Sequence, residues 1–439
     1  MSLINSYSHP VIRGQADIFS LPSTDTTSET SFYAEYKPLV NIQDSDSKIE
    51  FRIAGNVNQY LDLSDSFLMI RVKVVGSDLK DLDPAVDVST ANLFLHSLFS
   101  QCDVSINNHQ ISTSNNCYAY KAYIETMLSY GKEYIGSQGT CSLFYLDTNG
   151  GSLDTSNTGY AERQKFVSGS KPIELIDRLR IDLSSQHRYI LNDTNLNICL
   201  TRSSDEFSLF YKHTGVATDP HVNPKVKFLD ASFFVRKYVL YPSLVLSHQR
   251  LLESGQSAKY AYKKSDVKFF TIPKSNQSFT EENLFLGSLP SRIVLCLVTS
   301  SGFNGDYQQN PYLFNHYDLN YACVTVNNMP IPIRGMHLNF KNNSQCLLPY
   351  YLLFTSLGIA GQDQGLPFDR HNYGSNNCFL SFDLNSAGGS DSMMLLEKSG
   401  TVRIELKFSK ALPEAINCLV YSEHQSVLEI NSFRQATVN

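Results

Sequence analysis

Hydrophobic and polar residues alternate with a period of two in many short segments of this chain. Residues 49–53 place Ile49, Phe51 and Ile53 on one face, and residues 59–65 and 67–75 are also rich in strand-forming residues. Such segments predict β-strands, and the turn residues between them favour a sandwich or barrel over βαβ units. Strand-like segments continue to the end of the chain and helix-like segments are few, so the predicted fold class is all-β.

One pattern occurs twice. FLHSLFSQCDVSINNHQI, which begins at Phe94, aligns without a gap with FNHYDLNYACVTVNNMPI, which begins at Phe314. The offset of 220 positions is about half of the 439 residues, as expected after duplication of one domain. The matched pairs are Phe94 and Phe314, His96 and His316, Val104 and Val324, Ile106 and Val326, Asn107 and Asn327, Asn108 and Asn328, and Ile111 and Ile331.

Both copies of the pattern predict the same local structure. V-S-I and V-T-V have strand alternation, and the Asn-Asn pair that follows predicts a turn because Asn tolerates a positive φ. A helix-like segment comes after each copy, at residues 115–134 and 346–361. The two halves are therefore expected to fold alike, each as a β-rich domain with a short helix in a connection.

The chain divides into three predicted parts. Residues 1–45 are rich in Ser and Thr and form a predicted N-terminal arm, followed by a first β domain at 46–230 and a second at 231–439. A small apolar group at Ile18, Phe19, Leu21 and Pro22 interrupts the arm. Two interpretations stay open: this group docks on a neighbouring subunit, or it packs on its own domain. The conformations of loops 140–170, 205–225 and 360–395 are not predicted.

Composition narrows the function. Only 18% of residues are charged, whereas 25 Tyr and 26 Phe suit broad sheets and large buried interfaces. The net charge of −6 and the lack of a basic stripe argue against direct nucleic-acid binding. Nine cysteines occur singly, which favours reduced thiols and an intracellular place of synthesis. The N-terminus has no secretory signal pattern, and membrane contact is left open.

Motifs for catalysis are missing from the sequence. It contains no P-loop, no H-E-x-x-H, no G-x-S-x-G and no H-x-H pair, so neither an enzyme nor a metal or other cofactor is predicted. His96 and His316 recur at matched positions, which would suit ligands or pH switches. The favoured interpretation is structural: each satisfies backbone groups at the start of a strand, beside a buried Phe.

Several longer segments carry a resemblance to a known family. They are DIFSLPST at 17–24, IEFRIAG at 49–55, FLHSLFSQCDV at 94–104, YKAYIETML at 120–128 and NPYLFNH at 310–316. Taken in order, they resemble the double-jelly-roll major capsid proteins of Polinton/Maverick elements and adintoviruses, and more distantly those of virophages.

The resemblance implies an architecture and an assembly. It implies two consecutive eight-stranded antiparallel jelly rolls with short helices in the loops. It also implies a hexon-like homotrimer of pseudo-hexagonal outline that tiles an icosahedral virion shell. The expected partners are other copies of the chain and a penton or minor capsid protein, and assembly inside the host cell is expected.

Two alternatives remain. A double-jelly-roll protein could bind or process glycans, which would call for paired carboxylates or a calcium site in a cleft. A domesticated, transposon-derived capsid homologue with a host role would have the same sequence features as a viral protein.

Overall fold

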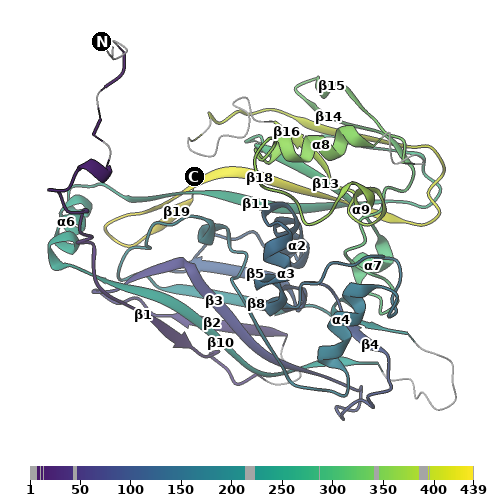
Figure 1. The fold of residues 1–439 in the computed structure, drawn as a ribbon, viewed down its shortest axis with the longest axis horizontal. Coiled ribbons are helices and arrows are strands. Elements are labelled where there is room, and N and C mark those ends of the chain that lie inside the picture. Colours follow the sequence, from purple (N-terminus) through teal and green to yellow (C-terminus); the bar gives the residue numbers. More distant parts are fainter. Residues whose placement is uncertain are drawn as a thin grey trace.

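The computed structural model shows two β units side by side, with the first half of the chain in one and the second half in the other (Figure 1). Helix α2 (Tyr118–Ser129) lies between them. The structure describes residues 7–9, 11–12, 14–42, 47–212, 223–285, 287–340, 346–384, 394 and 396–438.

The first unit contains two four-stranded antiparallel sheets. One has the order β1-β10-β3-β7 and the other the order β2-β8-β5-β6. Their bounds are β1 (Ser28–Tyr36), β10 (Lys225–Leu240), β3 (Tyr60–Val75), β7 (Ile173–Asp177), β2 (Lys48–Ile53), β8 (Leu196–Arg202), β5 (Phe99–Ile106) and β6 (His109–Gln110).

The second unit repeats this arrangement strand for strand. Its sheets have the orders β11-β18-β13-β16 and β12-β17-β14-β15. The strands are β11 (Ala258–Ile272), β18 (Ile416–Ile430), β13 (Arg292–Thr299), β16 (Leu380–Asp383), β12 (Ser278–Glu281), β17 (Val402–Phe408), β14 (Leu319–Val326) and β15 (Met329–His337). Each unit is an eight-stranded jelly roll, so the predicted all-β double jelly roll is confirmed.

The remaining elements lie in the connections or extend a sheet edge. Both predicted helical segments are confirmed, as α2 and as α8 (Leu347–Ser356). The other elements are η1 (Gly14–Ala16), β4 (Val88–Thr90), α1 (Phe94–Ser97), α3 (Lys132–Gly136), η2 (Gln138–Ser142), α4 (Thr158–Val167), η3 (Asp182–Ser185), α5 (Asp205–Ser208), β9 (Leu209–Tyr211), α6 (Pro242–Glu253), α7 (Ser300–Asn304), α9 (Arg370–Ser375) and β19 (Ala436–Val438).

Alternating side chains place the two sheets of each unit around a core. In β2, Ile49, Phe51 and Ile53 are buried, while the residues between them are exposed. In the second unit, strand β17 buries Val402, Ile404, Leu406 and Phe408 in the same way. Period-two burial of this kind is the physical origin of the strand signal in the sequence.

Two predicted boundaries differ from the observed strands. Strand β1 lies inside the predicted arm 1–45, and β10 runs through the predicted boundary at residue 230 as far as Leu240. Strand β1 falls within the predicted arm because it is an edge strand, paired with β10 alone among the described residues, and Phe32 and Tyr33 are 40% and 43% exposed. The polar composition of residues 1–45 therefore gives little sign of β1, which is held in the sheet by its backbone hydrogen bonds. Loop 140–170 contains η2 and α4, whereas parts of loops 205–225 and 360–395 lie outside the described residues.

Candidate self-association surface

The repeated residues occupy matching positions in the two hairpins β5–β6 and β14–β15. Val104 pairs with Ile198 of β8, and Val324 pairs with Ile404 of β17. Val104 and Val324 are buried, as is Ile106, whereas Val326 is half-buried. The bulge is repeated too: the register of β5 shifts between Phe99 and Gln101, and that of β14 between Leu319 and Tyr321. A shared bulge at the same offset as the sequence repeat supports a common origin for the two strands.

The asparagines form the hairpin turns. Asn107 and Asn108 have φ of 46° and 69°, and Asn327 and Asn328 have 48° and 67°. Two consecutive positive φ values give the turn type whose twist matches a β-hairpin. The first asparagine of each pair also fixes the turn to a neighbouring strand. Its side-chain oxygen accepts from the backbone N–H just before β8 (Asn195, 2.8 Å) or just before β17 (Thr401, 3.0 Å).

Ile111 and Ile331, the last residues of the two repeats, lie opposite Val104 and Val324 across their hairpins. The backbone N–H of Ile111 donates to the carbonyl of Val104 at 2.9 Å, and Ile331 lies opposite Val324 in the β14–β15 ladder. Ile111 is buried, whereas Ile331 is half-buried. The second hairpin is thus less covered than the first.

His96 is fully buried with two side-chain partners. Nε2 lies 3.1 Å from a carboxylate oxygen of Asp177, and Nδ1 lies 2.9 Å from the Tyr118 hydroxyl. Burial lowers the pKa of His96 although Asp177 acts to raise it, so the ring is neutral. In this state Nε2–H donates to Asp177 and Nδ1 accepts from Tyr118. The bonds differ from the expected backbone partners.

His316 has a different environment. Its Nδ1 accepts a hydrogen bond from the backbone N–H of Asp318 at 2.8 Å, and its ring stacks on Phe340 at 4.4 Å. Burial lowers its pKa as well, against the charge of Asp318. Phe94 and Phe314, which precede the two histidines in the repeat, are both fully buried.

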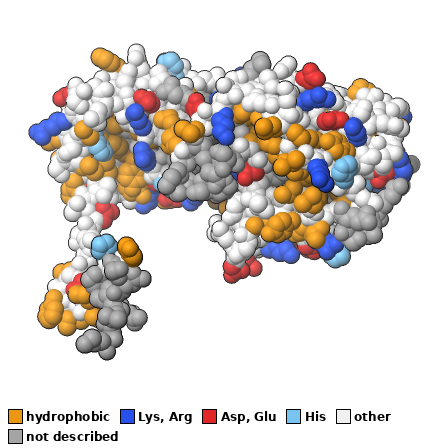
Figure 2. Space-filling view, turned by 90° about the horizontal axis from the view of Figure 1, so that it is seen from above, with side chains coloured by type: hydrophobic (Ala, Val, Ile, Leu, Met, Phe, Trp, Pro, Cys, Tyr) orange, Lys and Arg blue, Asp and Glu red, His pale blue; other side chains and the backbone are white. Residues whose placement is uncertain are grey.

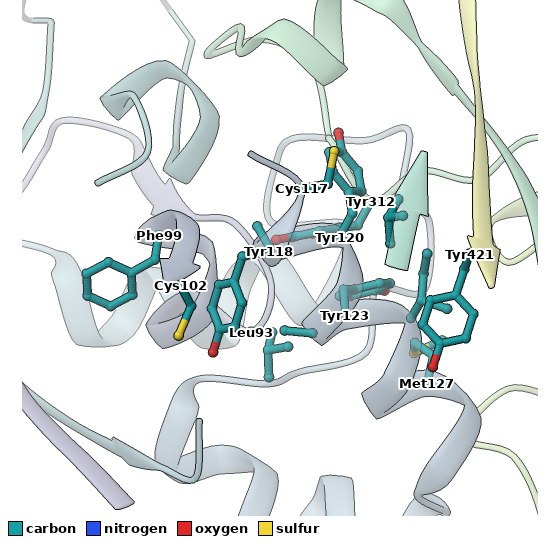
Figure 3. Packing of buried hydrophobic residues seen from close by; sticks show 14 of the residues in the cluster. Leu93, Phe99, Cys102, Cys117, Tyr118, Tyr120, Tyr123, Met127, Tyr312 and Tyr421 are labelled. Carbon is teal, nitrogen blue, oxygen red and sulfur yellow. The ribbon is translucent and has the colours of Figure 1, made fainter. Parts of the chain in front are cut away.

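An aromatic cluster joins the two jelly rolls. Tyr123 of α2 stacks on Tyr312 of the second unit with ring centroids 4.1 Å apart and planes 8° apart (Figure 3). Tyr120 stacks on Phe303 at 5.3 Å. Every residue of α2 except Lys121, Glu125 and Ser129 is buried. Large aromatic surfaces removed from water dominate the energy of such a contact.

Polar contacts also join the two jelly rolls beside this aromatic cluster. The Asn115 amide donates to Asp266 at 2.6 Å and to the carbonyl of Val267 at 2.9 Å. Lys121 lies 2.5 Å from Asp182, which also accepts from the Ser265 hydroxyl at 2.9 Å. Burial opposes the charge on Lys121, but the nearby Asp182 and Glu125 outweigh it and raise its pKa. The two jelly rolls are therefore held by specific bonds as well as by apolar packing.

Helix α8 follows β15 as α2 follows β6, but it is far more exposed. Both helices begin after a cysteine with nearly the same backbone, Cys117 (φ −115°, ψ 19°) and Cys346 (φ −108°, ψ 24°). On α8, however, Leu347, Leu348 and Tyr351 are 47%, 52% and 59% exposed. Figure 2 looks onto the side of the second unit that lies away from the first and shows apolar side chains gathered there. We call Leu347, Leu348 and Tyr351 the α8 face.

The described residues offer little for catalysis. They contain no group of three or more His, Cys, Asp or Glu side chains placed to hold a metal ion. Burial raises the pKa of the Cys102 and Cys117 thiols to about 12, so neither is a ready nucleophile. No helix among these residues is long and apolar enough to span a membrane.

The sequence analysis did not predict the α8 face or the equivalence of Cys117 and Cys346 in the two halves. Cys117 and Cys346 are 229 positions apart, not 220, because the hairpin of the second unit is longer: β15 has nine residues and β6 has two. A gapped comparison of the halves would have found this pair. The exposure of α8 has no signal in the sequence, since an apolar helix reads as a buried one.

Comparison with curated proteins gives a relative of unknown role. No protein-family model matches the chain. An uncharacterized protein of Caenorhabditis elegans is 23% identical over 440 residues, covering 95% of this chain and 99% of that protein.

Solved structures show similarity along the whole chain. The structure of the Sputnik virophage has a TM-score of 0.66 at 12% identity and covers 100% of this chain and 94% of that one. The mavirus major capsid protein has a TM-score of 0.55 at 10% identity, covering 100% and 95%. The PBCV-1 virus capsid also has a TM-score of 0.55 at 10% identity, covering 96% and 98%. The chain thus has the fold of the double-jelly-roll viral major capsid proteins.

Proposed function

We propose that this chain is a major capsid protein that forms pseudo-hexameric homotrimers, which tile an icosahedral shell. The observation that carries the proposal is the contrast between α2 and α8. In the first jelly roll the helix after the hairpin is buried against the second jelly roll, and in the second jelly roll the corresponding helix presents an apolar face. The likeness to viral major capsid proteins supports a capsid role.

A trimer would give the α8 face a partner. Within the chain, the first jelly roll contacts the second through α2. If the same relation continues from the second jelly roll to the first jelly roll of another subunit, three chains close a ring of six similar lobes. Such a head-to-tail contact closes when its rotation divides the circle evenly. Each α8 face would then be buried as α2 is.

The lineage and partners that we propose follow the sequence resemblance. The segments at 17–24, 49–55 and 94–104 favour the Polinton/Maverick–adintovirus group. In that setting the protein resides in the virion and contacts neighbouring trimers and a penton or minor capsid protein. It has no enzymatic role in this proposal and does not bind the genome directly.

The experiment is light scattering and electron microscopy of the purified protein. We expect trimers with interfaces on the order of 2,000 Å² per pair, and shells at higher concentration. Leu348→Asp combined with Tyr351→Asp should prevent trimer formation, because each buries a charge at the contact. Phe166→Asp on α4, a comparably exposed aromatic at 41%, serves as the matched control. A stable wild-type monomer at micromolar concentration would contradict the proposal.

The Caenorhabditis elegans relative favours a second candidate, a domesticated homologue with a host role. It matches almost end to end, so a chain of this length and pattern is also encoded by an animal genome. Microscopy of the native source distinguishes the two: a capsid protein is found in particles that enclose DNA, whereas a domesticated product is found without them.

A further inference from the structure

The first jelly roll has a binding site for the segment that follows the last strand of the second. After β18 ends at Ile430, the chain turns back through Arg434. The Arg434 guanidinium donates to the Asn192 side chain at 2.9 Å, and its carbonyl accepts from the Asn107 side chain at 2.6 Å. Asn107 lies in the β5–β6 turn, and Asn192 lies four residues before β8. We call this pair of positions the hairpin seat.

The second jelly roll has the same seat, and it is open in the part of the chain that the structure describes. Asn327 corresponds to Asn107, and Lys398 lies four residues before β17 as Asn192 does before β8. Both line a groove of about 820 Å³. Met329, Ile333 and Leu396 in this groove are 73%, 86% and 89% exposed. Exposed apolar side chains gathered in one concave surface are typical of a protein–protein contact.

We propose that this groove binds Tyr241 and helix α6 of a second copy of the chain. The proposal rests on the trimer proposed above and names one of its contacts. Strands β10 and β18 hold the same place in their sheets, so the segment after β10 corresponds to the segment after β18. If the relation between the two jelly rolls continues to the next subunit, the segment after its β10 reaches the seat at Asn327 and Lys398.

Helix α6 is longer than its counterpart after β18 and has exposed apolar side chains. The segment after β18 forms only a short hairpin with the three-residue strand β19, whereas α6 has twelve residues. One side of α6 is held by its own subunit, where His248 lies 3.0 Å from the Tyr60 hydroxyl and Leu252 is buried. Leu246 on another side is 54% exposed, and Tyr241 before the helix is 41% exposed. These apolar side chains are available to the groove.

The charges of the two surfaces are compatible. Arg250 and Glu253 are exposed and lie four and seven residues after Leu246, which places them on the same side of the helix. Exposed Glu397 and Lys398 line the groove. Each surface thus contributes one charge of each sign, so these residues give neither surface a net charge that repels the other.

Cross-linking in solution tests the contact. In a Cys141→Ser background, which removes the exposed native thiol, Leu246→Cys is combined with Ile333→Cys. Purified trimers are treated with a short bis-maleimide and separated under denaturing conditions. We expect covalent dimers and trimers from the double variant and monomers from either single variant. Phe166→Cys with Ile333→Cys is the matched control and is expected to stay monomeric.

A second variant makes the test independent of the reagent. Ile333→Asp should raise the dissociation constant of the trimer about tenfold or more, because the groove then buries an unpaired charge. Trimers that neither cross-link through Leu246→Cys and Ile333→Cys nor weaken with Ile333→Asp would overturn this contact and leave the proposed function standing. Wild-type monomers would overturn both.

Discussion

At the scale of single residues, His96 shows how a repeated side chain can differ in its chemistry between the two copies. His96 is sealed between Asp177 and Tyr118, with Arg180 3.6 Å from the same carboxylate. His316 lies at a half-exposed strand start and serves a backbone N–H. Both rings are neutral at neutral pH because burial lowers their pKa. Removing the His96 side chain, however, would take one hydrogen-bond partner from Asp177 and one from Tyr118.

We expect His96→Ala to lower the free energy of unfolding by about 2–3 kcal/mol, because the buried Tyr118 and Asp177 each lose a partner. Thermal or urea unfolding measures the change. Phe166→Ala on the exposed side of α4 is a control that should change stability by less than about 1 kcal/mol. Unchanged stability of the His96→Ala variant would show that these hydrogen bonds add nothing to stability.

The lowered pKa of His96 also predicts a pH dependence. The unfolded state takes up a proton near the ordinary histidine value of 6.5, and the folded state does so only at lower pH. Stability from this group is therefore complete above about pH 7 and is lost as the pH falls below about 6.5. His248, His316 and His424 shift in the same direction. Unfolding midpoints between about pH 7.5 and 5.5 should fall for the wild type and fall less for His96→Gln; equal slopes would exclude this role for His96.

At the scale of elements, the hairpin and the helix after it recur in both jelly rolls. The turn residues, the bulge and the pairing of the valines recur together in β5–β6 and β14–β15. These features were predictable from the sequence wherever they depend on local geometry, as with Asn-Asn at two positive φ values. Edge strand β1 was not, because its one-sided pairing leaves its side chains half-exposed and weakens the alternation.

The turns give an element-scale prediction. Asn108 and Asn328 are exposed and have φ of 69° and 67°, so their conformation, not their packing, limits substitution. Asn108→Val should destabilise by about 1–2 kcal/mol, since a β-branched residue disfavours the left-handed region, whereas Asn108→Gly should be nearly neutral. Urea unfolding compares the pair, and the same contrast is expected at Asn328. Equal stability of the Val and Gly variants would contradict the turn assignment.

The aromatic cluster between the jelly rolls gives a second prediction at the scale of elements. Tyr123→Leu and Tyr312→Leu should each destabilise by about 1–3 kcal/mol. Their combined effect should be smaller than the sum by about 0.5–1.5 kcal/mol, because either change alone already breaks the stack. A double-mutant cycle from chemical unfolding gives this coupling. Strict additivity would mean that the 4.1 Å stack is not a source of stability between the jelly rolls.

At the scale of the whole molecule, the sequence predicted the architecture but not the surfaces. Alternating strands and a half-length repeat predicted two similar β-rich domains, because burial within each unit is recorded residue by residue in the pattern, and the family resemblance specified jelly rolls. The α8 face and the open groove at Asn327 depend on which side of an element meets solvent. A single sequence does not distinguish an apolar side chain buried within its own subunit from one buried at a contact with another subunit.

The N-terminal segment also belongs to this scale. Ile18, Phe19 and Leu21 are 75%, 95% and 92% exposed, and the segment extends away from the two jelly rolls (Figure 1). Deleting residues 2–24 should leave the unfolding temperature and trimer formation unchanged, because the apolar group has little contact with its own subunit. Shell assembly should become inefficient, because an exposed apolar group of this kind suits docking on a neighbour. Unfolding scans, light scattering and microscopy separate these effects, and normal shells would rule the docking out.

The covalent joining of two jelly rolls changes how the proposed six-lobed ring would respond to dilution. Six separate lobes would assemble with the sixth power of their concentration, whereas three joined pairs do so with the third power, because α2 has already united half of the contacts within each chain. A scarce protein early in synthesis would therefore form rings at concentrations where single lobes would not. Joining also lets the two copies differ within one molecule: α6 is a helix, whereas its counterpart after β18 forms a short strand.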